Sequence, residues 1–174
     1  MIKNVSIDVL AQLKQQLKAL RPDQYNQKLP VLNGSSIGAH TRHIMEFYQC
    51  LLQGAAEGII NYDARCRNMQ IQENLDYTLH LVDDICQDLE NWQNKTESLQ
   101  LAVQFGKDAL QWIPTNFLRE EIYLIEHSVH HFALIRIGIQ ESFSNIPVAE
   151  NFGIAYSTIA FKKENQLKQA QTTI

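Results

Sequence analysis

Long apolar runs are missing from this 174-residue sequence, and no stretch reaches the 18 apolar residues that a membrane-spanning helix needs. Residues 1–4 also lack the apolar segment of a secretory signal peptide. We therefore expect a cytoplasmic protein with no membrane partner.

Basic residues are scarce as well: 15 Lys and Arg stand against 19 Asp and Glu, for a net charge of −4. They are scattered along the chain, whereas a nucleic-acid binder needs them gathered on one face. We therefore expect no nucleic-acid partner.

Cysteine occurs three times, at Cys50, Cys66 and Cys86. An odd number at long, irregular spacings fits neither a CxxC metal knuckle nor a disulfide framework, so we expect three free thiols. The chain is 45% hydrophobic and only 20% charged, which suits one globular domain over residues 1–174, with a tail that frays after about residue 165.

Four segments carry apolar residues at helical spacing. The first ends at Arg21-Pro22, Ser35 or Ser36 can cap the second, and the fourth is apolar on nearly every side, as a buried helix is. The predicted helices cover residues 6–20, 36–52, 73–92 and 117–140.

The remaining segments connect these helices. Residues 22–34 form a polar connector and residues 54–72 a long loop, and the tail is helical to about Gln169. Residues 99–105 alternate with period two before a Gly-containing turn, which predicts a small β-hairpin with residues 109–113. The sequence thus predicts an all-α domain, a four-helix bundle with a β-hairpin inserted before the last long helix.

Histidines gather in the fourth predicted helix, at positions 127, 130 and 131. His127 and His131 are one turn apart, so both imidazoles lie on one face and can bind one metal ion. A third ligand must come from another helix, and His43 is the best candidate. Three neutral imidazoles suit zinc, nickel, copper or iron and leave a coordination position open.

The other polar residues near this pattern have more than one interpretation. His130 points about 100° away from His131 and is better placed to pack or to hydrogen-bond a neighbour. His40 fits a partner that orients a ligand, a proton relay, or a plain core histidine. Glu126 precedes His127, so no HExxH motif is completed, and inert core histidines remain the alternative for the whole set. His80 lies off the apolar stripe and is expected at the surface.

An open coordination site needs access. We expect a pocket whose wall includes the loop at residues 62–65 or the turn at residues 151–153, with Arg65 or Arg67 available to an anionic substrate group. The alternative is a pair of surface arginines bonded to Asp63 or Glu73.

Two motifs carry a resemblance to a known family. Ser36-Ile37-Gly38-Ala39-His40-Thr41-Arg42-His43-Ile44 and His127-Ser128-Val129-His130-His131 resemble the histidine motifs of the DinB/YfiT-like superfamily, in the same order. The resemblance covers roughly residues 5–160. It implies an up-down-down-up bundle with a divalent metal, commonly zinc or nickel, on His43, His127 and His131.

Members of that superfamily include S-transferases and isomerases that use low-molecular-weight thiols, so the resemblance implies a small-molecule substrate and a thiol partner. This chain has Phe132-Ala133-Leu134 where relatives often carry Arg-Gly-Gln, and Ser128 where they often carry an acidic residue. The metal ligands themselves are unchanged.

Three functions stay open at this point. The first is a metal-dependent transferase with an external thiol as nucleophile. The second is a hydrolase, for which Glu46 and Glu126 are the nearest candidate bases in sequence. The third is a metal-binding bundle without turnover, and a homodimer is open for any of the three.

Overall fold

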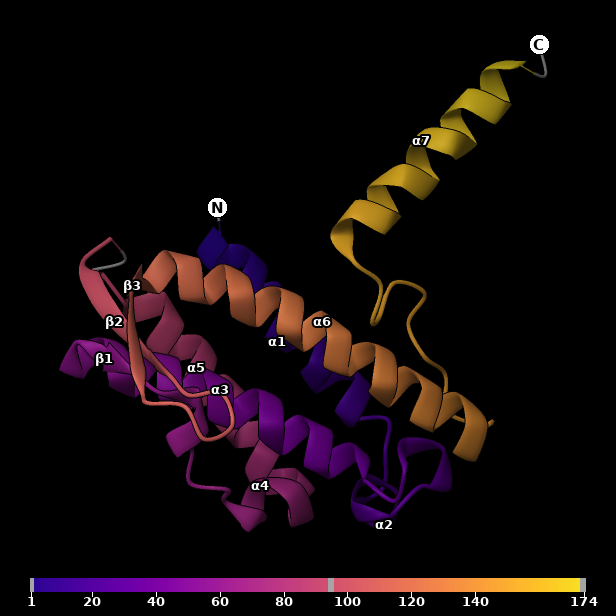
Figure 1. Ribbon diagram of the computed structural model, residues 1–174. Coiled ribbons are helices and arrows are strands. Elements are labelled where there is room, and N and C mark those ends of the chain that lie inside the picture. The colour runs from indigo at the N-terminus through magenta and orange to yellow at the C-terminus, as the bar shows by residue number, and fades with distance from the viewer. Residues whose placement is uncertain (1, 94–95, 173–174) are drawn as a thin grey trace.

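The computed structural model describes residues 2–93 and 96–172. Four helices enclose the core: α1 (Ile2–Leu17), α3 (Ile37–Glu57), α5 (Leu75–Asn91) and α6 (Phe117–Ser142). Helix α1 packs against both α5 and α6, and so does α3 (Figure 1). These helices confirm the four long helical segments predicted from the apolar spacing.

Polar side chains fix where three of these helices begin. The Ser36 hydroxyl accepts a hydrogen bond from the Ala39 amide at the start of α3. At the start of α5 the Asn74 side-chain oxygen accepts from the Tyr77 amide, and at the start of α6 the Asn116 side-chain oxygen accepts from the Arg119 amide. Each cap satisfies an amide that has no partner within its helix, so the register of the histidines on α3 and α6 is set from the first turn.

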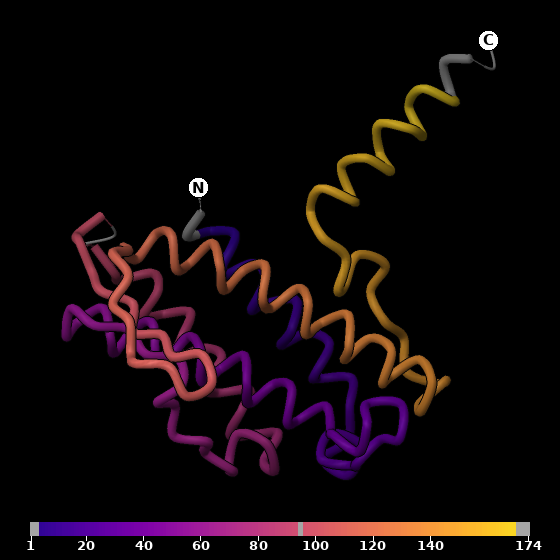
Figure 2. Tube along the Cα trace, in the orientation of Figure 1, coloured from indigo at the N-terminus to yellow at the C-terminus, as the bar shows by residue number. Residues whose placement is uncertain are grey.

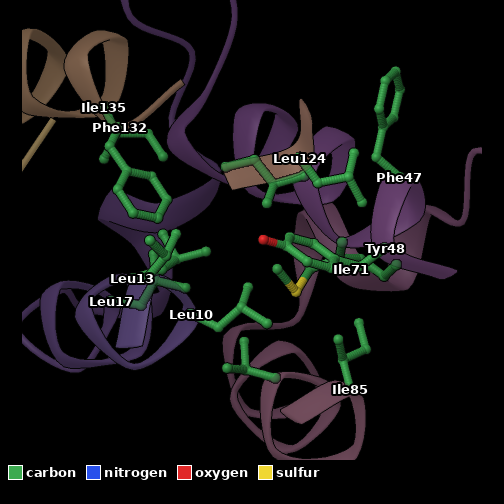
Figure 3. Close-up of a cluster of buried hydrophobic side chains, with 14 of the residues drawn as sticks. Leu10, Leu13, Leu17, Phe47, Tyr48, Ile71, Ile85, Leu124, Phe132 and Ile135 are labelled. Carbon is green, nitrogen blue, oxygen red and sulfur yellow. The ribbon is translucent and has the colours of Figure 1, made fainter. Parts of the chain in front are cut away.

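The core lies between these helices. Leu10, Leu13 and Leu17 of α1 face Phe132 and Ile135 of α6 (Figure 3). Burying one such side chain contributes about 1.5–3 kcal/mol, and a helix gains this only when its apolar residues share one face.

The two aromatic residues in the middle of α3 point in different directions. Tyr48 reaches into the leucine cluster, whereas Phe47 points away from it (Figure 3). One side of α3 therefore packs the core, and the adjacent side, which carries Phe47, is left for the site described below.

Short elements occupy the two segments that the sequence predicted as a polar connector and a long loop. The connector contains α2 (Pro22–Asn26) and η1 (Pro30–Leu32). The long loop contains β1 (Ile59–Ile60), η2 (Tyr62–Ala64) and α4 (Met69–Glu73). Asn61 and Asn68 cap η2 and α4 with their side chains, so this loop is ordered by local hydrogen bonds.

The predicted all-α four-helix bundle is wrong, because the molecule contains a three-stranded mixed sheet. The predicted hairpin is present as β2 (Ser98–Val103) and β3 (Gln111–Asn116), with Gln100 opposite Pro114. Proline is tolerated there because β3 is an edge strand. β1 adds a parallel strand on the other side of β2, with Ile60 opposite Leu101.

The chain beyond α6 turns back along that helix before α7 (Tyr156–Thr172) leaves the body of the molecule (Figure 2). The Phe152 ring stacks on Phe132 at 4.6 Å between centroids, and Arg136 donates a hydrogen bond to the Phe152 carbonyl. Among the described residues, no helix combines the length and the apolar character needed to cross a membrane.

Candidate metal site

His43 of α3 and His127 and His131 of α6 meet where the two helices pack. One ligand atom of each lies within 4.8 Å of the others, which is close enough for one ion to bind all three. The Nε2 atoms of His43 and His127 are 2.8 Å apart, and the His131 ring centroid lies 4.5 Å from that of His43 and 4.7 Å from that of His127. The predicted group is therefore assembled from two helices.

Burial keeps these three half-buried imidazoles neutral. It lowers the pKa of His43 to about 4, with further contributions from His127 and Arg65, and the pKa of His131 to about 3, with further contributions from the two other ligands. Burial also lowers the pKa of His127. A neutral imidazole offers the lone pair that a metal requires, so the donor set fits a metal ion such as zinc, nickel, copper or iron.

His40 lies beside the three histidines. Its Nδ1 is 3.0 Å from Nδ1 of His131, one turn of α3 before His43. Burial lowers its pKa, and the neighbouring His130 adds to this shift. Of the three interpretations left open by the sequence, the contact favours a hydrogen-bond partner that orients His131.

His130 and Glu126 are exposed and lie further from the group. The His130 ring meets His131 only edge-on, at 5.6 Å between centroids. Burial raises the pKa of Tyr156, and the charges of Asp8 and Glu126 add to this, which places Glu126 toward α7. His80 is exposed on α5, as the sequence predicted.

Arg65 is held beside the histidines. Its Nη1 donates to the Tyr62 carbonyl at 3.3 Å, its Nε lies 3.5 Å from Oε2 of Glu46, and its guanidinium carbon lies 5.6 Å from the centre of the Phe47 ring. The carboxylate that it meets is Glu46, and not Asp63 or Glu73 as in the alternative interpretation.

Arg67 differs from Arg65, because it is exposed and has a positive φ of 53°. The structure thus brings Arg65 toward the histidines, and Arg67 lies at the surface of the same loop.

Four aromatic rings form a closed cluster around the outer side of the site. Phe47 stacks on Tyr62 and on His127, in both cases at 4.8 Å between centroids. Tyr123 completes the cluster at 5.7 Å from Tyr62 and 5.4 Å from His127. Sequence reasoning missed this cluster because Phe47 belonged to an apolar stripe and Tyr62 lay in a loop with no partner to be inferred.

A buried carboxylate is hydrogen-bonded to one member of this aromatic cluster. Glu120 of α6 accepts hydrogen bonds from the Tyr62 hydroxyl at 3.0 Å and from the Thr115 hydroxyl at 2.6 Å. Burial, followed by the Glu120 charge, raises the pKa of Tyr62, so this hydroxyl stays protonated and keeps donating.

The predicted pocket wall at residues 62–65 is partly present. Tyr62 and Asp63 line a pocket of about 390 Å³ that also includes Phe47 and Tyr123. The turn at residues 151–153 lines a different cavity, of about 470 Å³, whose wall contains none of the three histidines. The 390 Å³ pocket contains none of the three histidines either, but Phe47 and Tyr123 of its wall stack on His127, so the loop pocket adjoins the site through these two rings.

Neither a protein-family model, nor a curated protein, nor a solved structure matches this chain. The DinB/YfiT-like resemblance stays a prediction from two motifs. What the geometry itself supports is a group of three histidines able to hold a metal ion.

Proposed function

We propose that this protein binds one zinc or nickel ion through His43, His127 and His131 and joins a low-molecular-weight thiol to an electrophilic small molecule. One observation carries the proposal: three neutral imidazoles on two packed helices offer ligand atoms within 4.8 Å of one another. When bound, such a cation supplies Lewis-acid chemistry that lowers the pKa of a thiol or a water toward neutrality.

The protein's contribution is an uncharged ligand set. Because none of the three imidazoles is negatively charged, the site favours an anionic reactant such as a thiolate. In the proposed reaction the sulfur attacks an electrophilic carbon, a C–S bond forms, and the leaving group departs with its bonding electrons. The thiol proton passes to solvent.

The protein's own thiols do not suit this role. Burial raises the pKa of Cys50, and it raises that of Cys86 to about 11, so both resist forming a thiolate. Cys66 is exposed in the loop before α4. An external thiol is therefore the better nucleophile.

Hydrolysis is the second candidate, and the carboxylates argue against it. Glu46 is 2% exposed, accepts a hydrogen bond from the Asn68 amide, and faces Arg42 and Arg65. A carboxylate whose oxygens are held by an amide and two arginines is not free to take a proton from a water at the histidine group. Glu126 lies toward α7.

Metal analysis of purified variants tests the site. Wild-type protein should retain about one zinc or nickel per chain after desalting, and His43→Ala and His131→Ala should retain almost none. His80→Ala is the matched control, since it removes an exposed histidine whose ring bonds to the Asp76 carbonyl of its own helix. Equal metal content in all four proteins would overturn the site.

An activity assay tests the reaction class. The metal-loaded protein, a model electrophile and added thiol should give conjugate at a rate that rises with thiol and falls when a chelator removes the metal. Metal-dependent ester cleavage without thiol would favour the hydrolase instead. Metal binding without either reaction across a broad panel would favour a bundle without turnover.

A further inference from the structure

The pocket next to the histidines has a composition that points to a class of ligand. It lies between the hairpin, the η2 loop and the first turns of α6, and its volume is about 390 Å³. Small-molecule pockets typically range from about 300 to 1,000 Å³, so this one suits a compact ring system. The apolar part of its lining consists of Phe47, Tyr62, Leu101, Ala102, Val103, Phe105 and Tyr123.

None of the three histidines lines the pocket, and two aromatic rings of its wall separate it from the candidate metal site. Phe47 and Tyr123 line the pocket, and both stack on the His127 ring, at interplanar angles of 15° and 24°. Phe47 also lies 4.3 Å from the His43 ring centroid. A small molecule in the pocket is thus separated from the His43 and His127 imidazoles by one aromatic ring.

The charged residues of the pocket already have partners or lie at its edge. The Glu120 carboxylate is held by two hydroxyl groups, and Nη1 of Arg119 lies 3.6 Å from that carboxylate, while the Arg119 guanidinium sits over the Tyr123 ring. Asp63 is exposed at the opening. Recognition is therefore left to aromatic faces, which favour flat apolar groups.

We propose that this pocket binds the neutral, flat aromatic part of the electrophile, and that the reactive carbon extends past the edge of the Phe47 and Tyr123 rings toward the histidine group. The inference rests on the proposed function and adds the class of substrate to it. An aliphatic electrophile of similar reactivity gains no stacking in the pocket and should be the poorer substrate.

Binding of 2-naphthol, an uncharged fluorescent aromatic, tests the pocket without turnover. The full-length protein should bind it both with zinc and after chelation. Val103→Trp fills the pocket from β2 and should weaken binding at least tenfold, and Tyr123→Leu should weaken it about threefold to tenfold through lost stacking.

Ile113→Trp is the matched control, because it adds the same ring to the neighbouring strand at a residue outside the pocket lining. Circular dichroism should be unchanged in each variant, and metal content should be unchanged in Val103→Trp and Ile113→Trp. Unaltered affinity in Val103→Trp would place the probe elsewhere, for example in the groove between α3 and α5 that Trp92 lines, and would overturn the inference.

The two proposals fail in different ways. If naphthol binds as expected but no thiol conjugation occurs, the proposed function is wrong and the pocket stands. If conjugation is metal-dependent but an aromatic and an aliphatic electrophile have equal kcat/KM, or if naphthol does not bind the wild type, the pocket inference is wrong and the proposed function stands.

Discussion

The Nδ1 atom of His131 makes the contact that orients this proposed ligand. Its Nδ1 lies 3.0 Å from Nδ1 of His40, and one of the two nitrogens must carry the proton that they share. If His131 donates, its Nε2 keeps a bare lone pair for the metal. Metal-bound histidines usually donate their other N–H to a fixed acceptor in this way, and His40 would supply that acceptor.

Replacing His40 tests this hydrogen bond. In His40→Asn the amide oxygen can accept in the place of Nδ1, so zinc affinity should stay within a few-fold of wild type. His40→Leu keeps the bulk but removes the acceptor, and affinity should fall about 10–100-fold. Competition with a zinc-binding dye measures both. Wild-type affinity in His40→Leu would show that the contact does not orient the ligand.

The histidine group was predictable from the sequence, but the role of His40 was not. A spacing of four residues places His127 and His131 on one face of any helix, whatever the fold. The contact between His40 and His131 depends on how α3 and α6 are rotated against each other, which the spacing within one helix does not specify. The same holds for the Phe47, Tyr62 and Tyr123 cluster, since its members come from three separate elements.

Gly54 allows strand β1 to pack closely against helix α3. A Cβ atom at this position would lie 2.5 Å from the Ile59 carbonyl oxygen and 2.9 Å from Cα of Ile60. Both are backbone atoms of β1, which therefore packs against α3 closer than a residue with a side chain would allow. β1 leads directly into η2, so this close approach also positions Tyr62.

Gly54→Ala should therefore destabilise the protein, although alanine is normally favoured over glycine in a helix by about 0.5–1 kcal/mol. Displacing the β1 backbone should cost about 1–3 kcal/mol, seen as a lower urea midpoint. Gly138→Ala in α6 is the control, because its Cβ would meet the movable methyl end of Leu32 at 2.9 Å. A loss at Gly138 as large as at Gly54 would refute the explanation.

The hairpin was predictable and the third strand was not, for a physical reason. β2 alternates along its own sequence, so its period can be read locally. β1 has only two residues and exists because it pairs with Gln100 and Leu101, about 40 positions further on. Such a strand has no local period, and a parallel partner far along the chain cannot be inferred from apolar spacing.

Burial by the surrounding elements keeps the histidine group neutral, and it lowers the stability of the folded protein in acid. The helices and the η2 loop bury His43 and His131 in a region that also holds the Arg65 charge. Both imidazoles therefore have pKa values below the ordinary 6.5, at about 4 and about 3. In the unfolded chain their pKa values return to about 6.5.

As the pH falls, the metal-free protein should consequently lose stability at a higher pH than it would if only its carboxylates were protonated. Below about pH 6.5 the unfolded chain binds protons at these two sites while the folded chain does not, so stability falls as the pH falls from about 6.5 toward 4. The chelated protein should show a lower Tm at pH 5 than at pH 7.5. In His43→Asn/His131→Asn this difference should shrink, because the two titrating groups are gone. His80→Asn, which removes an exposed histidine, is the control. If it flattened the profile equally, burial of the histidine group would not be the cause.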